Sequence, residues 1–106
     1  MFVAWTTVAN RADADRLATG AVERGLAVCA QIDGPIASVY RWEGKIERSE
    51  EFRLVFKCLP ARVGELESYV LGAHPYAIPE WVAVRAESVG EKYLSWAEAT
   101  VHSPPL

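Results

Sequence analysis

Residues 26–58 read LAVCAQIDGPIASVYRWEGKIERSEEFRLVFKC, and this stretch decides the fold. Two arms rich in β-branched and aromatic residues, Leu26 to Trp42 and Lys45 to Cys58, flank Glu43-Gly44, a pair that suits a hairpin turn. Asp33-Gly34-Pro35 interrupts the first arm and predicts a bulge or bend there. The arms are long compared with usual strands of about 3–10 residues, so the hairpin projects from the domain unless something covers it.

The segments on either side of this hairpin alternate between strand and helix patterns. Phe2 to Val8 is short and apolar, as in a buried strand, and a helix that Asn10 can cap follows it as far as Gly25. After the hairpin, the sequence predicts a helix, a short strand and a terminal helix. These cover Pro60 to Gly72, Trp81 to Ala86 and Glu91 to Ala99.

The order of elements is therefore βαββαβ followed by a helix, which is the ferredoxin-like pattern of an α+β fold. Both crossovers can be right-handed, and the two helices then cover one face of a four-stranded antiparallel sheet. A chain of 106 residues has the usual size of one domain. We expect a single domain over residues 1–102 and a loose tail over residues 103–106.

Composition and charge exclude several classes of function. The net charge is −3, with 11 basic and 14 acidic residues mixed along the chain, so no basic stripe is available for nucleic acid. The first residues, Met1 to Trp5, lack the features of a signal peptide, and no apolar run approaches the length that spans a membrane. Two cysteines are too few for a disulfide scaffold, so a cytoplasmic location is expected.

Few residues are suited to catalysis. Cys29 and His74 are the only pairing that could supply a nucleophile and its base, and Cys29 lies in an apolar strand where a small buried thiol is the simpler interpretation. Phosphate-binding glycine loops and the usual metal motifs are missing from the sequence. We therefore expect that the protein is not an enzyme.

A loop between the second helix and the last strand carries the most informative polar residues. It reads His74-Pro75-Tyr76-Ala77-Ile78-Pro79-Glu80, and its two prolines restrict the backbone. Imidazole and carboxylate suit copper or zinc, so His74 and Glu80 are candidate metal ligands. The alternative is that His74 hydrogen-bonds the chain behind the helix, because one histidine alone rarely makes a metal site.

The hairpin also carries residues with two interpretations. Tyr40 and Trp42 lie on one side and Arg41 on the other, where the aromatic pair could line a pocket or pack against a neighbouring subunit. We favour the subunit contact. Lys57, near the end of the second arm, could bind an anion or pair with a carboxylate.

Several blocks of this sequence together resemble CutA, the divalent-cation tolerance protein family. They keep the family's order and spacing over about two thirds of the chain. The blocks are Cys29-Ala30-x-Ile32, Ser38-x-Tyr40-x-Trp42-x-Gly44-Lys45-Ile46, Glu51, Lys57, His74-Pro75-Tyr76-x-x-Pro79-Glu80 and Gly90-x-x-Tyr93-Leu94-x-Trp96.

The resemblance implies a homotrimer with a ferredoxin-like fold, whose long hairpins wrap neighbouring subunits as in the similar trimeric PII signalling proteins. It implies a role in divalent-cation tolerance, with copper bound by some members and with no established enzymatic activity. The expected interface residues are Tyr40, Arg41, Trp42 and Ile46. The expected ligand cleft consists of Tyr76, Lys57, Tyr40 and Trp96.

This chain departs from the family at the reported copper ligands. Trp5-Thr6-Thr7 stands where some members have a cysteine, and Ala73 replaces the first histidine of a pair, so only His74 carries over. Weak binding of Cu²⁺ or another divalent cation, with no required cofactor, is therefore the expectation. Two alternatives stay open, a PII-like sensor of a small anionic metabolite and a trimer with a purely structural role. Neither nucleic acid nor membrane is an expected partner.

Overall fold

The computed structural model describes residues 1–102, and the predicted tail lies outside them. Four strands and three helices follow one another in the predicted order. They are β1 (Phe2–Val8), α1 (Arg11–Glu23), β2 (Cys29–Trp42), β3 (Lys45–Cys58), α2 (Val63–Ala73), β4 (Val82–Arg85) and α3 (Glu91–His102), with a short 3-10 helix over Pro60–Arg62. The strand order in the sheet is β2-β3-β1-β4, and all neighbours are antiparallel. The predicted α+β, ferredoxin-like architecture is confirmed.

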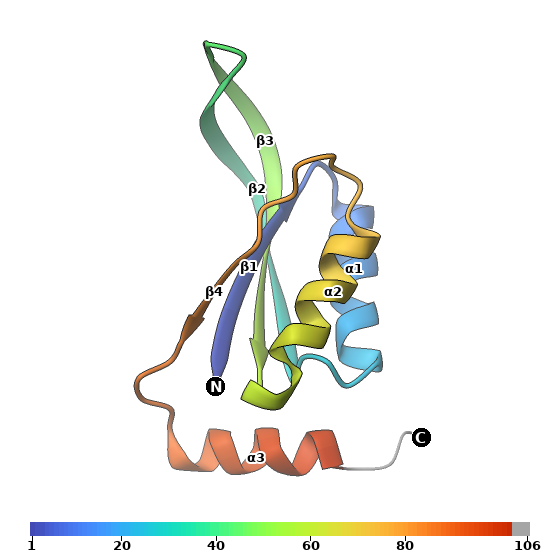
Figure 1. The fold of residues 1–106 in the computed structure, drawn as a ribbon, viewed down its shortest axis with the longest axis vertical. Coiled ribbons are helices and arrows are strands. Elements are labelled where there is room, and N and C mark those ends of the chain that lie inside the picture. Colours follow the sequence, from blue (N-terminus) through green and yellow to red (C-terminus); the bar gives the residue numbers. More distant parts are fainter. Residues whose placement is uncertain (103–106) are drawn as a thin grey trace.

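Helices α1 and α2 cover one face of this sheet (Figure 1). Alternate residues of β1 and β3 face them and are buried, and the core also takes in the inner faces of both helices. Its largest side chains are Phe56, Leu17, Leu54, Leu66, Val8 and Val70. The strand residues between these positions point to the opposite face of the sheet, since successive side chains of a strand alternate. We call that surface the open face.

Local signals fixed the elements around the first helix. The side chain of Asn10 accepts a hydrogen bond of 2.9 Å from the amide of Asp13, so it caps α1 as predicted. Gly25 follows the helix and has a φ of +70°, a left-handed backbone conformation that favours glycine. The amides of Leu26 and Ala27 then bond back to Ala21, which is why β2 begins at Cys29 and not at Leu26.

Three other predicted elements have boundaries that differ from the structure by a few residues. The second helix opens as a 3-10 turn at Pro60, and α2 continues through Gly72 to Ala73. Glycine tolerates a helical backbone, so it did not end the helix. Strand β4 lacks Trp81 and Ala86 at its ends, and α3 runs to His102 instead of Ala99.

The predicted hairpin has the expected strands, turn and interruption. Glu43 and Gly44 have φ values of 49° and 77°, as in a two-residue turn of the primed type. The pairing of β2 with β3 shifts register between Asp33 and Ile36, so the predicted bulge is confirmed. Beyond the last pair that β1 makes with β3, the hairpin projects from the body (Figure 1). The radius of gyration, 14.7 Å, exceeds the value of about 13 Å for a compact domain of this length.

Candidate functional site

The imidazole of His74 is buried at the C-terminal end of α2, where it holds the following loop. Its Nδ1 accepts a hydrogen bond of 3.1 Å from the amide of Tyr76. Its Nε2 lies 2.9 Å from the carbonyl oxygen of Thr7, at the end of β1. A carbonyl only accepts, so Nε2 carries the proton and the ring is neutral. Both nitrogens of His74 are therefore engaged in structural hydrogen bonds.

This arrangement does not fit a metal centre at His74 and Glu80. A ligating imidazole offers one nitrogen to the metal, and here each nitrogen already has a protein partner. Glu80 is exposed, and its backbone carbonyl accepts a hydrogen bond of 2.7 Å from Thr6 Oγ1. Within residues 1–102 no three His, Cys, Asp or Glu side chains gather as a metal would need. The geometry thus favours the structural alternative for His74.

Tyr76 connects the same loop to the hairpin. Its hydroxyl donates a hydrogen bond of 2.9 Å to Oε2 of Glu51 on β3. The Glu51 side chain is buried, with only 9% of its surface exposed. Burial first, and then the hydrogen bond to Glu51 and its charge, raise the pKa of the Tyr76 phenol well above its usual value. The phenol therefore stays protonated and acts as the donor.

Glu51 is a site residue that the strand pattern missed. Alternation along β3 placed it with Arg53 and Lys57 on the polar side, and Phe52, Leu54 and Phe56 do face the core as that pattern requires. The partner of Glu51 is 25 residues away, in a loop. Local periodicity contains no signal for such a contact.

The expected ligand cleft does not form within one chain. Tyr76 bonds Glu51, and Lys57 lies six residues further along β3, a separation of roughly 20 Å in a strand. Lys57 instead donates to the side-chain oxygen of Gln31 on the neighbouring strand. Tyr40 is on the projecting hairpin and Trp96 is on α3. These four residues therefore do not share a cleft within one described copy, and the ligand cleft stays a prediction.

Trp96 belongs to a second aromatic cluster at the Lys57 end of the sheet. Its ring packs against Tyr93 with centroids 5.5 Å apart. Burial, and next the neighbouring Cys29, raise the pKa of Tyr93. Cys29 pairs across the strands with Lys57, and α3 lies beside this lower end of the sheet (Figure 1).

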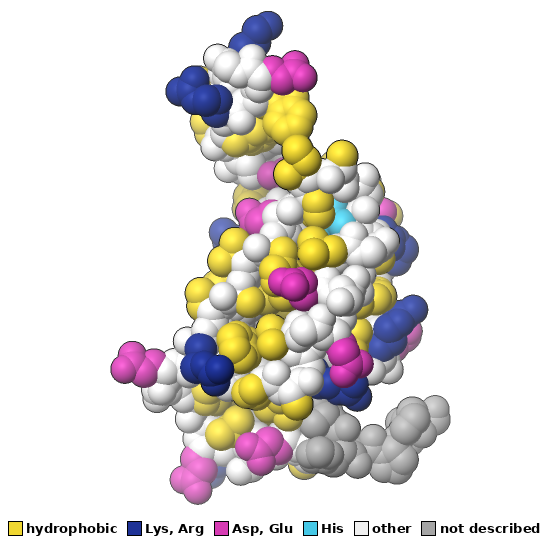
Figure 2. Space-filling view, in the orientation of Figure 1, with side chains coloured by type: hydrophobic (Ala, Val, Ile, Leu, Met, Phe, Trp, Pro, Cys, Tyr) yellow, Lys and Arg dark blue, Asp and Glu magenta, His cyan; other side chains and the backbone are white. Residues whose placement is uncertain are grey.

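The hairpin exposes apolar side chains on both of its sides. Tyr40 and Trp42 lie on one side, with about half of the Trp42 surface exposed. Ile46, on the other side, is 64% exposed and pairs with Arg41 across the strands. Figure 2 shows hydrophobic side chains on the surface of the hairpin and of the body below it. The interface residues expected from the sequence are thus uncovered in a single copy.

The part of the open face that β1 and β4 form is also apolar, whereas β3 contributes the polar residues Arg53 and Lys57 to it. In register, Val3 pairs with Val84 and Trp5 pairs with Val82, and these pairs lie on the side away from α1 and α2. Val82 and Val84 are apolar strand residues, and about half of the surface of each is exposed. Exposed apolar side chains that gather on one surface in this way often mark a contact with another molecule.

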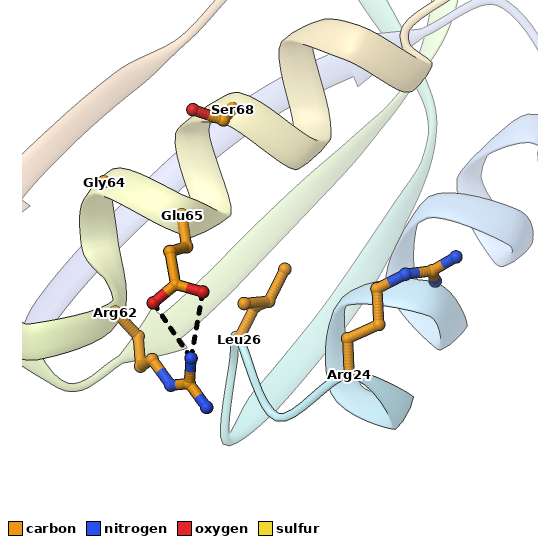
Figure 3. A pocket seen from close by; sticks show the side chains of 6 residues that line it. All are labelled: Arg24, Leu26, Arg62, Gly64, Glu65 and Ser68. Atoms are coloured by element: carbon orange, nitrogen blue, oxygen red, sulfur yellow. Dashed lines mark hydrogen bonds and ion pairs between the residues drawn. The ribbon is translucent and has the colours of Figure 1, made fainter.

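Two shallow hollows offer little to a small anion. The larger, of about 520 Å³, lies between α1 and α2 (Figure 3), where Arg62 holds Glu65 by two hydrogen bonds of 2.9 and 3.0 Å. Arg24, at its edge, bonds the carbonyl of Gly20 and lies over the Tyr69 ring. The smaller, of about 400 Å³, lies on the open face, and its Arg53 is paired with Asp33 at 3.2 Å.

Comparisons with known proteins agree with this architecture. A family model described as "CutA1 divalent ion tolerance protein" matches residues 2–100. A CutA homolog of Xenopus laevis is 37% identical over 93 residues, which cover 88% of this chain and 62% of that protein. The divalent-cation tolerance protein CutA of Thermus thermophilus is 33% identical over 90 residues, covering 85% of this chain and 87% of that protein.

Solved structures agree as well. The structure of CutA from Synechococcus elongatus superposes with a TM-score of 0.89 at 35% identity, covering 94% of this chain and 88% of that one. The chain spans about half to three fifths of the length of the animal and plant relatives that it matches.

Proposed function

Because this chain belongs to the CutA1 divalent ion tolerance family, we propose that it acts in divalent-cation tolerance as a non-catalytic homotrimer. The observation that carries the proposal is the uncovered apolar surface of the hairpin and the open face. The relatives' names support the cellular role, and the exposed apolar surfaces support the assembled form. The predicted resemblance to CutA is confirmed, and the role of this chain rests on it.

Assembly is supported by the surfaces that a single copy leaves in water. Tyr40, Trp42 and Ile46 on the hairpin, together with Val82 and Val84 on the open face, are each between 43% and 64% exposed. Full burial of an apolar side chain stabilises by about 1.5–3 kcal/mol, so covering the exposed half of each of these contributes roughly 1 kcal/mol. A hairpin that projects away from the rest of its own chain cannot cover the open face of that chain. It can cover the open face of another copy. In a closed ring of identical subunits every hairpin can cover a neighbouring subunit, and no subunit is left uncovered at an end.

The non-catalytic part of the proposal is supported by how the reactive groups are used. His74 has both ring nitrogens in hydrogen bonds, so it is not available as the base of a nucleophile. Burial raises the pKa of the Cys58 thiol to about 11, and the thiol is therefore protonated and inaccessible. Cys29 lies beside Tyr93. The hydrogen bonds of the His74 ring go to Thr7 and Tyr76 and not to Cys29.

Ion handling in this proposal does not depend on a copper centre at His74. Any divalent cation would bind weakly, through surface carboxylates or between copies. The sensor of an anionic metabolite stays a prediction, and the engaged cations Lys57, Arg24 and Arg62 do not favour it. Among residues 1–102 the structure contains no helix long and apolar enough to cross a membrane. The cytoplasmic location stays a prediction.

A growth assay tests the cellular role. A host strain that lacks its own copy of this family should regain growth in inhibitory Cu²⁺ or Zn²⁺ when it expresses this chain. The assembly-defective variant Trp42→Ala should restore less growth at equal protein level, because the proposal requires the trimer. Failure of the unaltered chain to change the inhibitory concentration of either ion would contradict the proposal.

A further inference from the structure

Glu51 lies where the hairpin leaves the body of the molecule. Strand β1 pairs with β3 from Phe2 opposite Cys58 to Val8 opposite Phe52, which is the residue next to Glu51. On the other strand, the bulge ends at Ile36, the residue that pairs with Glu51. From Glu51 outward the two arms are paired only with each other. This position is the root of the hairpin.

A short series of hydrogen bonds leads from the end of β1 to this root. His74 Nε2 donates to the Thr7 carbonyl, Nδ1 of the same ring accepts from the Tyr76 amide, and the Tyr76 hydroxyl donates to Glu51. The rings of His74 and Tyr76 also meet edge to face, with centroids 4.8 Å apart. The connection from α2 to β4 crosses the upper end of β1 at the level of the root (Figure 1).

The burial of Glu51 indicates a role in orientation. A carboxylate at 9% exposure gains nothing from the hydrophobic effect, and its burial has a desolvation cost. A hydrogen bond of 2.9 Å to a protonated phenol offsets part of that cost and has a preferred direction. Asp13 and Tyr40 act on the same phenol electrostatically and also keep it protonated. An apolar pair at this position would fix the angle between loop and hairpin less tightly.

We propose that the Tyr76–Glu51 hydrogen bond, anchored through His74, is a strut that sets the direction in which the hairpin leaves the body. Tyr76 and Glu51 are then positioning residues for assembly, because both are less exposed than the hairpin side chains that would meet another copy. For its consequence in assembly this inference rests on the proposed trimer. The strut itself is a property of each copy and is measured separately.

Hydrogen exchange of the full-length protein tests the strut. In Tyr76→Phe, which removes one hydroxyl, amides of residues 36–51 should exchange about tenfold faster, the factor that loss of one hydrogen bond to a charged group gives. Amides of residues 52–58, which pair with β1, should be unchanged. The comparison variant is Tyr40→Phe, because the Tyr40 hydroxyl has an exposed contact of 3.5 Å with Ser49 and acts on Tyr76 only electrostatically, so its removal keeps the Tyr76–Glu51 hydrogen bond. Equal exchange of residues 36–51 in both variants would overturn the proposal.

Substitution of Glu51 separates positioning from packing. Glu51→Gln keeps an oxygen that accepts from Tyr76, so exchange in the hairpin should stay within about twofold of the parent. Glu51→Met has a similar size without an acceptor and should match Tyr76→Phe. Fast exchange in Glu51→Gln and slow exchange in Glu51→Met would assign the site to packing and reject the strut. Sedimentation of the same samples reports the trimer independently, so a monomeric parent would contradict the proposed function without deciding the exchange result.

Discussion

Replacing Trp42 by alanine is expected to separate the assembly into single copies that remain folded. In one copy the Trp42 side chain is about half exposed on the projecting hairpin, so its removal leaves the core unchanged. In the proposed trimer it is an aromatic anchor, and truncation of such anchors costs about 2 kcal/mol or more. A ring repeats the contact three times, which gives a loss of about 6 kcal/mol, or about 10⁴-fold in the association constant.

Sedimentation velocity over a dilution series from micromolar to nanomolar checks this prediction. Leu71→Ala is the matched control, because Leu71 is 41% exposed but lies on α2, on the helical side of the sheet. The control should sediment like the parent at every concentration. A Trp42→Ala protein that stays assembled at the same dilutions as Leu71→Ala would place the contact elsewhere on the chain.

Replacing His74 by alanine is expected to lower stability by about 2–4 kcal/mol per chain. The change leaves the carbonyl of Thr7 and the amide of Tyr76 without partners in a partly buried setting, so the cost of each lies in the lower part of the range of about 1–3 kcal/mol for a buried group. Heats of titration with Cu²⁺ should be the same in parent and variant, because the imidazole has no free nitrogen. Urea unfolding at fixed protein concentration and calorimetric titration provide the two measurements.

His74→Asn gives a control of intermediate effect. The asparagine oxygen can replace Nδ1 as acceptor for the Tyr76 amide, while the bond to Thr7 is lost. Its loss of stability should therefore lie between those of the parent and His74→Ala. If His74→Ala instead keeps the parent's stability and loses the Cu²⁺ heat, His74 is a metal ligand and the structural assignment is wrong.

Much of the fold followed from signals that act over a few residues. The Asn10 cap, the positive φ at Gly25 and the Glu43-Gly44 turn each need particular residue types, and each was predicted from them. Strand β3 was predicted with both of its ends because the Glu43-Gly44 turn and Pro60 bound it, while Phe52, Leu54 and Phe56 alternate with polar residues in its second half. The end of the helix after Pro60 was not predicted correctly, because glycine allows the chain to leave a helix but does not require it to do so.

The site was harder to predict because its contacts join distant segments. The sequence loop His74–Glu80 was identified correctly as informative, but the partners of its side chains lie on β1 and β3. Residue types alone could not show that both nitrogens of His74 are engaged. They also suggested a cleft that combined Lys57 with Tyr76, which the length of β3 separates. Whether copies of the chain bring these residues together depends on the assembly.

The account depends most on self-association, which sedimentation equilibrium of the unaltered chain measures directly. A single chain has a mass of 11.7 kDa, so three copies have a mass of about 35 kDa. We expect a species of about 35 kDa that persists to submicromolar concentration. A species of 11.7 kDa formed by the unaltered chain at micromolar concentration would contradict the account, because the exposed apolar side chains of the hairpin and the open face would then not hold copies together.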